Sequence, residues 1–187
     1  MHVLIITDLE GISGVDSIDM IPCEAEDYKK ACEYLMADLN AAVDGAFLGG
    51  ATKVTVVDGH GSGMNFRMDL LDKRATVLPV REFIQQPGEA YSYDALMCVG
   101  AHAMAGTEQA FLDHTESSAR WFEYRINGTP CGEMAMEAYA LGAFGIPFVM
   151  MSGDQAACEE AETLVPGIAT ATVKQARGRN RAECIPQ

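Results

Sequence analysis

The chain has 187 residues, of which 49% are hydrophobic and 21% are charged, and this composition excludes a disordered or fibrous protein. Its formal net charge of −14 opposes binding to nucleic acids and anionic membranes but favours bound cations. We therefore expect a single domain over residues 1–187 that binds neither nucleic acid nor membrane.

The predicted elements alternate between strands and helices along the chain. Short β-rich runs predict strands, apolar residues at helical spacing predict helices, and Asn127-Gly128 is typical of a hairpin turn. In chain order we expect strand 2–7, helix 24–48, strand 53–57, strand 76–80, strand 95–99, strand 121–126, helix 133–144, strand 147–151, helix 154–164 and strand 168–173. This alternation predicts an α/β three-layer sandwich with a mainly parallel sheet.

The cysteines and the amino-terminal sequence indicate the cellular compartment of the protein. None of the six cysteines forms a C-x-x-C pair, and several lie in apolar periodic stretches, so we expect buried, reduced thiols in a cytoplasmic protein. The opening MHVLIITDLE lacks the basic region of a secretory signal. The most apolar window, residues 134–151, contains Glu137 and a Gly-Ile-Pro break, which argues against a membrane span.

Histidines and acidic residues follow the ends of the predicted strands, which is where α/β sheets bind ligands. Taken singly, a strand-end aspartate is often a turn former and a lone histidine is often structural. Their coincidence at several strand ends favours a common site at the carboxyl edge of the sheet. The residues are Asp8, Glu10, Asp58, His60, His102, His114 and Glu133.

Carboxylates and imidazoles are the usual ligands of zinc apart from thiolates. Asp8 and Glu10 lie two residues apart in an extended segment, so both can face one cation. If Asp8 bridged two ions, then Glu10, His60, His102 and Glu133 would complete three protein contacts per ion, as in catalytic zinc sites with an open position.

Two of the candidate residues are left outside this set of ligands. Asp58 can orient the imidazole of His60 as a hydrogen-bond acceptor behind it, or serve as a simple strand-end turn former. His114 is not needed as a metal ligand in this scheme. It can act as a general base, a proton shuttle or a stabiliser of a developing oxyanion.

Several segments, in this order, resemble the DppA-type zinc D-aminopeptidase family, and the resemblance covers nearly the whole chain. It implies a binuclear zinc site with two zinc ions per chain on Asp8, Glu10, His60, His102 and Glu133, and it places an additional catalytic histidine, described as a nucleophile, on His114. The segments are TDLEGISG, VVDGHGSGMN, VGAHAMAG, DHTES, NGTPCGEMAMEAYALGAFGIPFVMMSGD and TATVKQ.

The resemblance also implies an activity and an assembly. Members cleave short peptides that carry an amino-terminal D-amino acid, and they form ring-shaped, self-compartmentalising homo-oligomers such as decamers. Relatives usually have a further carboxy-terminal portion beyond the point that corresponds to the end of RAECIPQ. We expect the metal chemistry to be complete within residues 1–187, because all five ligand positions precede residue 134.

Two alternatives from other classes stay open at this point. Asp8-Leu9-Glu10-Gly11 is similar to the D-x-D-G motif of haloacid-dehalogenase-like phosphatases, and Ser152-Gly153-Asp154 is similar to their later acidic motif. That class uses magnesium and does not need histidines at strand ends. The second alternative is a non-catalytic metal- or peptide-binding module, which would have no need for His114.

Overall fold

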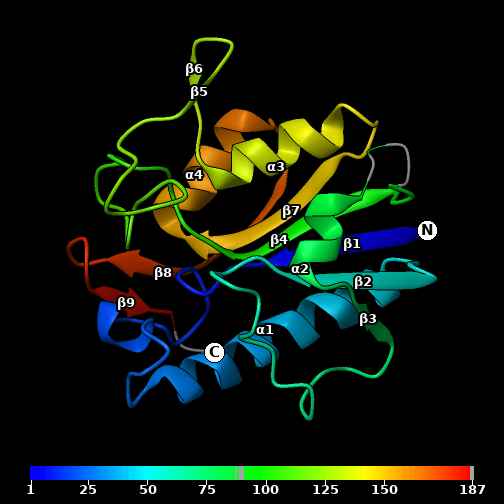
Figure 1. Ribbon diagram of the computed structural model, residues 1–187, viewed down its shortest axis with the longest axis horizontal. Coiled ribbons are helices and arrows are strands. Elements are labelled where there is room, and N and C mark those ends of the chain that lie inside the picture. The colour runs from blue at the N-terminus through cyan, green and yellow to red at the C-terminus, as the bar shows by residue number, and fades with distance from the viewer. Residues whose placement is uncertain (87, 89–90, 186–187) are drawn as a thin grey trace.

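The computed structural model describes residues 1–86, 88 and 91–185 and contains a seven-stranded sheet at its centre. The strand order is β3-β2-β1-β4-β7-β8-β9, and every neighbouring pair is parallel except β8 and β9. A separate antiparallel hairpin, β5 and β6, projects beyond the helices (Figure 1). The strands are β1 His2–Thr7, β2 Lys53–Asp58, β3 Ala75–Val77, β4 Ala95–Ala101, β5 Arg125–Ile126, β6 Thr129–Pro130, β7 Phe148–Asp154, β8 Ala169–Ala176 and β9 Ala182–Cys184.

Helices cover both faces of the sheet, with α1 on one side and α3 and α4 on the other (Figure 1). This arrangement confirms the predicted three-layer α/β fold with a mainly parallel sheet. The helices are the short 3₁₀ helix η1 Ile18–Met20, α1 Tyr28–Leu48, α2 Val80–Gln85, α3 Glu133–Gly142 and α4 Gln155–Leu164.

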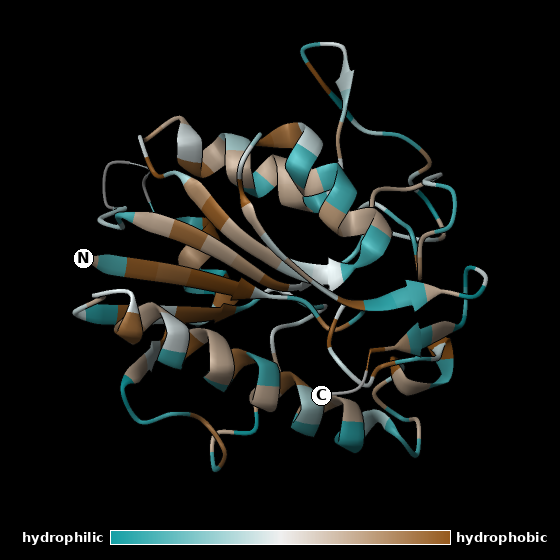
Figure 2. Cartoon of the chain, turned by 180° about the vertical axis from the view of Figure 1, so that it is seen from behind, coloured by the Kyte–Doolittle hydropathy of each residue, from teal (hydrophilic) through white to brown (hydrophobic). Residues whose placement is uncertain are grey.

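The central strands are apolar on both faces, as a sheet buried between two helical layers requires. Successive residues of β1 point to opposite faces, so Ile5 packs with Leu39 of α1 while Leu4 packs with Leu141 of α3. Each of these side chains is at most 2% exposed, and burying one stabilises the fold by roughly 1.5–3 kcal/mol. Figure 2 shows the apolar strands enclosed by helices whose outer faces are hydrophilic.

Helix α1 begins at Tyr28, four residues later than the predicted start at Glu24. The preceding residues form turns, in which the N–H of Ala25 donates to the carbonyl of Pro22 (2.8 Å) and the N–H of Tyr28 donates to that of Ala25 (3.3 Å). The acidic residues Glu24, Glu26 and Asp27 therefore precede the helix.

The predicted strand 76–80 is wrong at its carboxyl end. Strand β3 stops at Val77, and the extended Pro79 then precedes helix α2, which the sequence did not predict. Proline lacks the N–H that a strand ladder needs, and its carbonyl accepts the N–H of Phe83 (3.0 Å) at the start of the helix.

The predicted strand 121–126 is wrong for its first four residues. Trp121 and Phe122 are 43% and 83% exposed, and only Arg125–Ile126 pairs with another strand. The hairpin itself is confirmed, because Asn127 and Gly128 have φ angles of 51° and 83°, which suit a tight two-residue turn. Strand β9 was not predicted and pairs antiparallel with β8.

Most of the cysteines are buried, as the sequence predicts. All six cysteines are free, and Cys32, Cys98, Cys131 and Cys158 are buried as expected, whereas Cys23 is exposed. No helix in the described part of the chain combines the length and the apolarity that crossing a membrane requires.

Candidate metal centre

Three neighbouring strands, β2, β1 and β4, end at the same edge of the sheet, and each delivers predicted site residues there. Asp8 follows β1 directly, His60 lies two residues beyond β2, and His102 follows β4. The parallel register of the three strands brings these loops side by side. This is the position at which a parallel sheet binds its ligands.

Glycines let these loops approach one another closely. A Cβ on Gly11 would lie 2.1 Å from the carbonyl oxygen of Ala101, and one on Gly100 would lie 2.4 Å from that of Asp8. Gly100 also has a φ of 82°, which a residue with a side chain rarely adopts. The glycine after the two acids, in TDLEG, is therefore required by the contact between the ends of β1 and β4.

The first candidate group comprises Asp8, Glu10 and His60, whose potential ligand atoms all lie within 4.8 Å of one another. Nδ1 of His60 lies 3.0 Å from Oδ1 of Asp8 and 2.9 Å from Oε2 of Glu10. One ring nitrogen carries at most one proton, and its hydrogen bond is made to Asp8. Oε2 of Glu10 is consequently buried without a hydrogen-bond partner among the described residues.

The second candidate group comprises His102, His114 and Glu133, again with ligand atoms within 4.8 Å of one another. Nε2 of His102 and Nε2 of His114 lie 3.5 Å and 3.7 Å from Oε1 of Glu133. The two imidazole rings stack, with centroids 3.9 Å apart and planes inclined by 12°.

Backbone carbonyls set the orientation of both stacked rings. Nδ1 of His102 lies 2.9 Å from the carbonyl oxygen of Ala103, and Nδ1 of His114 lies 2.8 Å from that of Leu112. In the neutral form of each ring, Nδ1 therefore carries the proton and donates a hydrogen bond to a carbonyl, which leaves the lone pair of Nε2 directed at the site. This is the tautomer that a metal ligand or a general base needs.

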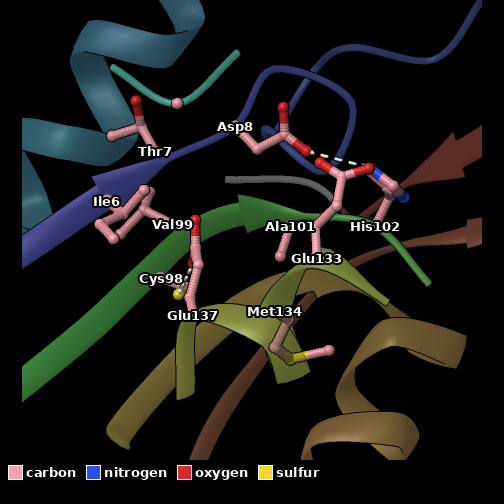
Figure 3. Close-up of a pocket in the computed structure, with 11 residues that line it drawn as sticks. Ile6, Thr7, Asp8, Cys98, Val99, Ala101, His102, Glu133, Met134 and Glu137 are labelled. Atoms are coloured by element: carbon pink, nitrogen blue, oxygen red, sulfur yellow. Dashed lines mark hydrogen bonds and ion pairs between the residues drawn. The ribbon is translucent and has the colours of Figure 1, made fainter. Parts of the chain in front are cut away.

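The two candidate groups form one continuous cluster, because Oδ2 of Asp8 lies 3.3 Å from Nε2 of His102. Figure 3 shows Asp8, His102 and Glu133 converging from the ends of β1 and β4 and from the first turn of α3. Glu133 is the first residue of α3, and its Oε1 accepts the backbone N–H of Glu116 (2.6 Å). All the predicted ligand positions, and His114 with them, thus lie together.

The cluster attracts positive charge strongly. Burial alone would lower the pKa of His60, but the hydrogen bond to Asp8 and the neighbouring negative charges of Asp8 and Glu10 outweigh it and raise that pKa to about 11. Burial opposes protonation of His102 as well, and Glu133 and Asp8 together raise its pKa to about 10. A site that stabilises cations to this extent is suited to metal ions.

Asp58 takes the second of its two predicted roles, that of a strand-end turn former. Its carboxylate accepts the backbone N–H (2.6 Å) and the side-chain Nδ2 (2.9 Å) of Asn65. Nδ2 of Asn65 also donates to the carbonyl of His60 (2.8 Å). Asp58 thus supports the backbone of the loop that carries His60, and its predicted orientation of the His60 imidazole stays a prediction.

Sequence reasoning missed two charged residues close to the centre. Lys174 of β8 is fully buried, and its Nζ donates to the carbonyls of Glu10 (2.7 Å) and Val15 (2.5 Å), which holds the loop after β1. The sequence signal for Lys174 was that it is the one charged residue in the strand ATATVKQA. Glu137 lies one helical turn after Glu133, a spacing that places both on the same face of α3.

Two hollows adjoin the cluster. A small cavity of about 30 Å³ is lined by Asp8, His102, Glu133 and Glu137 among others (Figure 3). A larger groove of about 710 Å³ is mainly apolar and shares Glu133 and Glu137 with the small cavity. Burial and neighbouring carboxylates raise the pKa of Glu137 to about 8.

Comparisons with known proteins agree with this architecture. The D-aminopeptidase of Bacillus subtilis (strain 168) is 29% identical over an alignment that covers 99% of this chain and 68% of that protein. The solved structure described as the Zn-dependent D-aminopeptidase DppA from Bacillus subtilis, a self-compartmentalizing protease, superposes with a TM-score of 0.90 at 27% identity. That alignment covers 99% of this chain and 68% of the solved chain.

The family comparison covers the chain from end to end. The model of peptidase family M55, described as D-aminopeptidase, matches residues 1–187. This match includes both candidate groups and the strands and helices that position them. The chain therefore belongs to the M55 family of D-aminopeptidases.

Proposed function

We propose that this protein is a zinc-dependent aminopeptidase that hydrolyses short peptides with an amino-terminal D-amino acid. The observation that carries the proposal is the convergence of imidazoles and carboxylates on one cluster at the carboxyl edge of the sheet. Membership of the D-aminopeptidase family supports the reaction, and the relative described as Zn-dependent supports the metal.

Five side chains hold the metal in this proposal. With two zinc ions, Asp8 would contribute to both, Glu10 and His60 would complete the ligands of one, and His102 and Glu133 would complete those of the other. Each ion then has three protein ligands, the number found in catalytic zinc sites.

The chemistry of the donors fits this assignment. Imidazole and carboxylate groups suit zinc, and a cation would satisfy the buried Oε2 of Glu10 that lacks a hydrogen-bond partner. When bound, zinc supplies Lewis acidity and makes water a nucleophile near neutral pH.

His114 moves a proton in this proposal. Its Nδ1 is committed to the carbonyl of Leu112, so Nε2 is the atom that accepts or donates a proton on the side of the site. Stacking on His102 holds the ring at a fixed position beside Glu133. We assign His114 this role rather than that of the nucleophile, because zinc, when bound, would supply a nucleophile from water.

A specific observation weakens the phosphatase alternative. Asp154, which would belong to its later acidic motif, is the N-cap of α4 and accepts the N–H of Ala157 (3.2 Å) and of Phe111 (2.9 Å). These hydrogen bonds give Asp154 a structural role. Membership of a peptidase family also favours the peptidase.

We further propose a ring-shaped homo-oligomer, a decamer, as the working assembly. The support is the description of the structural relative as a self-compartmentalizing protease. Exposed apolar side chains such as Phe122 are available for contacts between copies. The free cysteines suit a reducing compartment, so we propose a cytoplasmic location.

Matched dipeptides test the proposed activity. Metal-stripped protein and protein reloaded with zinc are each incubated with D-alanyl-D-alanine and with L-alanyl-L-alanine, and released alanine is measured. We expect cleavage only after zinc is restored, and faster cleavage of the D-peptide. Equal rates on both peptides would remove the D-preference. Zinc binding without cleavage of either peptide would favour the non-catalytic module.

A further inference from the structure

Glu137 is an acidic residue at the metal centre that the ligand set does not use. It lies on α3 one turn after Glu133, and its half-buried side chain lines the small cavity together with Asp8 and His102. Figure 3 shows its carboxylate beside β4, next to Cys98 and Val99 and below the cluster formed by Asp8, His102 and Glu133.

The carboxylate of Glu137 has no cationic partner in the described part of the chain. The interaction made with it is a hydrogen bond from the thiol of Cys98 to Oε2 (3.2 Å), and a thiol is a weak donor. Glu133, by contrast, accepts a backbone N–H and lies near two imidazoles. A partly buried carboxylate without a counter-charge is costly unless a ligand supplies one.

The position of Glu137 joins the small cavity to the larger groove. Ile6, Gly59, Glu133 and Glu137 line both hollows. The rest of the groove is mainly apolar and includes Val57, Val80, Phe83, Tyr91, Met136 and Leu141. A molecule with one cationic group and an adjacent apolar side chain would match this combination.

We propose that Glu137 binds the free α-ammonium group of the peptide substrate, with the amino-terminal side chain lying in the apolar groove. This inference rests on the proposed function. In a peptide, one carbon separates the ammonium nitrogen from the scissile carbonyl, and one helical turn separates Glu137 from Glu133. Binding the ammonium at Glu137 therefore presents the first peptide bond to the cluster, which explains cleavage at the amino terminus.

The test compares two substrates that differ only in the ammonium group. D-alanyl-D-alanine carries it, whereas propionyl-D-alanine lacks it and is otherwise the same. For zinc-loaded Glu137→Gln, which keeps the size of the side chain, we expect KM for D-alanyl-D-alanine to rise about 10- to 100-fold, the effect of one hydrogen bond to a charged group. We expect kcat to stay within about threefold, and kinetics on propionyl-D-alanine to stay unchanged.

Two further variants and a metal assay control the experiment. Glu137→Asp keeps the charge and should recover part of the loss, whereas Glu82→Gln removes the same charge from the exposed face of α2 at the border of the groove and should have no effect. Bound zinc should stay at the wild-type level in all variants.

Other results would overturn the inference. Loss of zinc from Glu137→Gln would make Glu137 a metal ligand, and equal losses on both substrates would make its role structural. Unchanged KM for D-alanyl-D-alanine would show that the ammonium binds elsewhere. If the wild-type protein cleaves neither substrate, the proposed function fails and the inference fails with it. If the wild-type protein cleaves D-alanyl-D-alanine and Glu137→Gln has an unchanged KM, only the inference fails.

Discussion

The two candidate groups of the metal centre are constructed differently. The first, with Asp8, Glu10 and His60, comes from the ends of adjacent strands and has contacts of 2.9–3.0 Å. In the second, the side chains of His102 and His114 lie 3.5 Å and 3.7 Å from Glu133. The Glu133 side chain is 33% exposed, whereas that of Glu10 is 6% exposed.

The first group is therefore more firmly held by the fold, and the second group is more open to a substrate. Lys174 donates a hydrogen bond to the carbonyl of Glu10 and so fixes the loop of the first group. The pairing of β1 with β2 fixes the positions of Asp8 and His60 relative to each other. In the second group only His102 directly follows a strand. His114 lies in a loop, and Glu133 begins α3 and also lines the apolar groove. We infer that, of the two proposed zinc ions, the one held by His102 and Glu133 lies on the side of the substrate.

The largest expected effect comes from the residue that connects the two groups. Asp8→Asn keeps the shape but removes the charge, so both ions lose a ligand and zinc content should fall for both. We expect kcat/KM to fall roughly 1,000-fold or more, since metal ions supply several kcal/mol of transition-state stabilisation. Metal analysis and peptide hydrolysis measure this.

Asp27→Asn is the matched control for that variant, because Asp27 is exposed and its side chain makes no capping hydrogen bond. It should behave as the wild-type protein. If Asp8→Asn kept two ions and full activity, the bridging role of Asp8 would have to be abandoned.

A smaller effect distinguishes ligands from the proton-transfer residue within the second group. His114→Ala should retain two zinc ions and lower kcat about 100-fold or more, the usual contribution of a general acid or base. His2→Ala, which changes the histidine at the far end of β1, should leave both quantities unchanged. Loss of one zinc ion from His114→Ala would place His114 among the ligands, as its distance to Glu133 also permits.

A graded effect, without any substitution, is the pH dependence of metal binding. Without metal, His60 and His102 have pKa values of about 11 and about 10, so both are protonated at pH 7 and metal must displace those protons. Apparent zinc affinity should therefore rise with pH, by up to about tenfold per pH unit for each proton displaced.

The same raised pKa values make stability of the metal-free protein depend on pH. Protonation of His60 and His102 stabilises the folded state fully below pH ~6.5, and this contribution is lost as pH rises through about 10 and about 11. Calorimetric zinc titrations in two buffers, with melting curves of the metal-free protein, measure both effects. Zinc affinity independent of pH between 6 and 8 would contradict the charged state assigned to these imidazoles.

The fold and the positions of the predicted ligands could be predicted from the sequence, because both depend on short stretches of neighbouring residues. Apolar runs define strands, and parallel strands end at one edge, so residues directly after those runs must gather there. Asp8, His60 and His102 follow this rule. The elements that were missed, such as α2 and β9, are short and depend on what lies beside them rather than on a long periodic pattern.

The sequence by itself determined an α/β sheet with acidic residues and histidines at its carboxyl edge, because it fixes which residue types follow each strand. Only the tertiary structure decided which atoms meet there. The stacking of His114 on His102, the hydrogen bonds of Asp58 to Asn65 and the contact of Glu137 with the thiol of Cys98 each depend on packing between segments distant in sequence or on the path of a loop. Such contacts are set by side-chain packing in three dimensions, and the periodicity of one segment carries no information about the partner it meets.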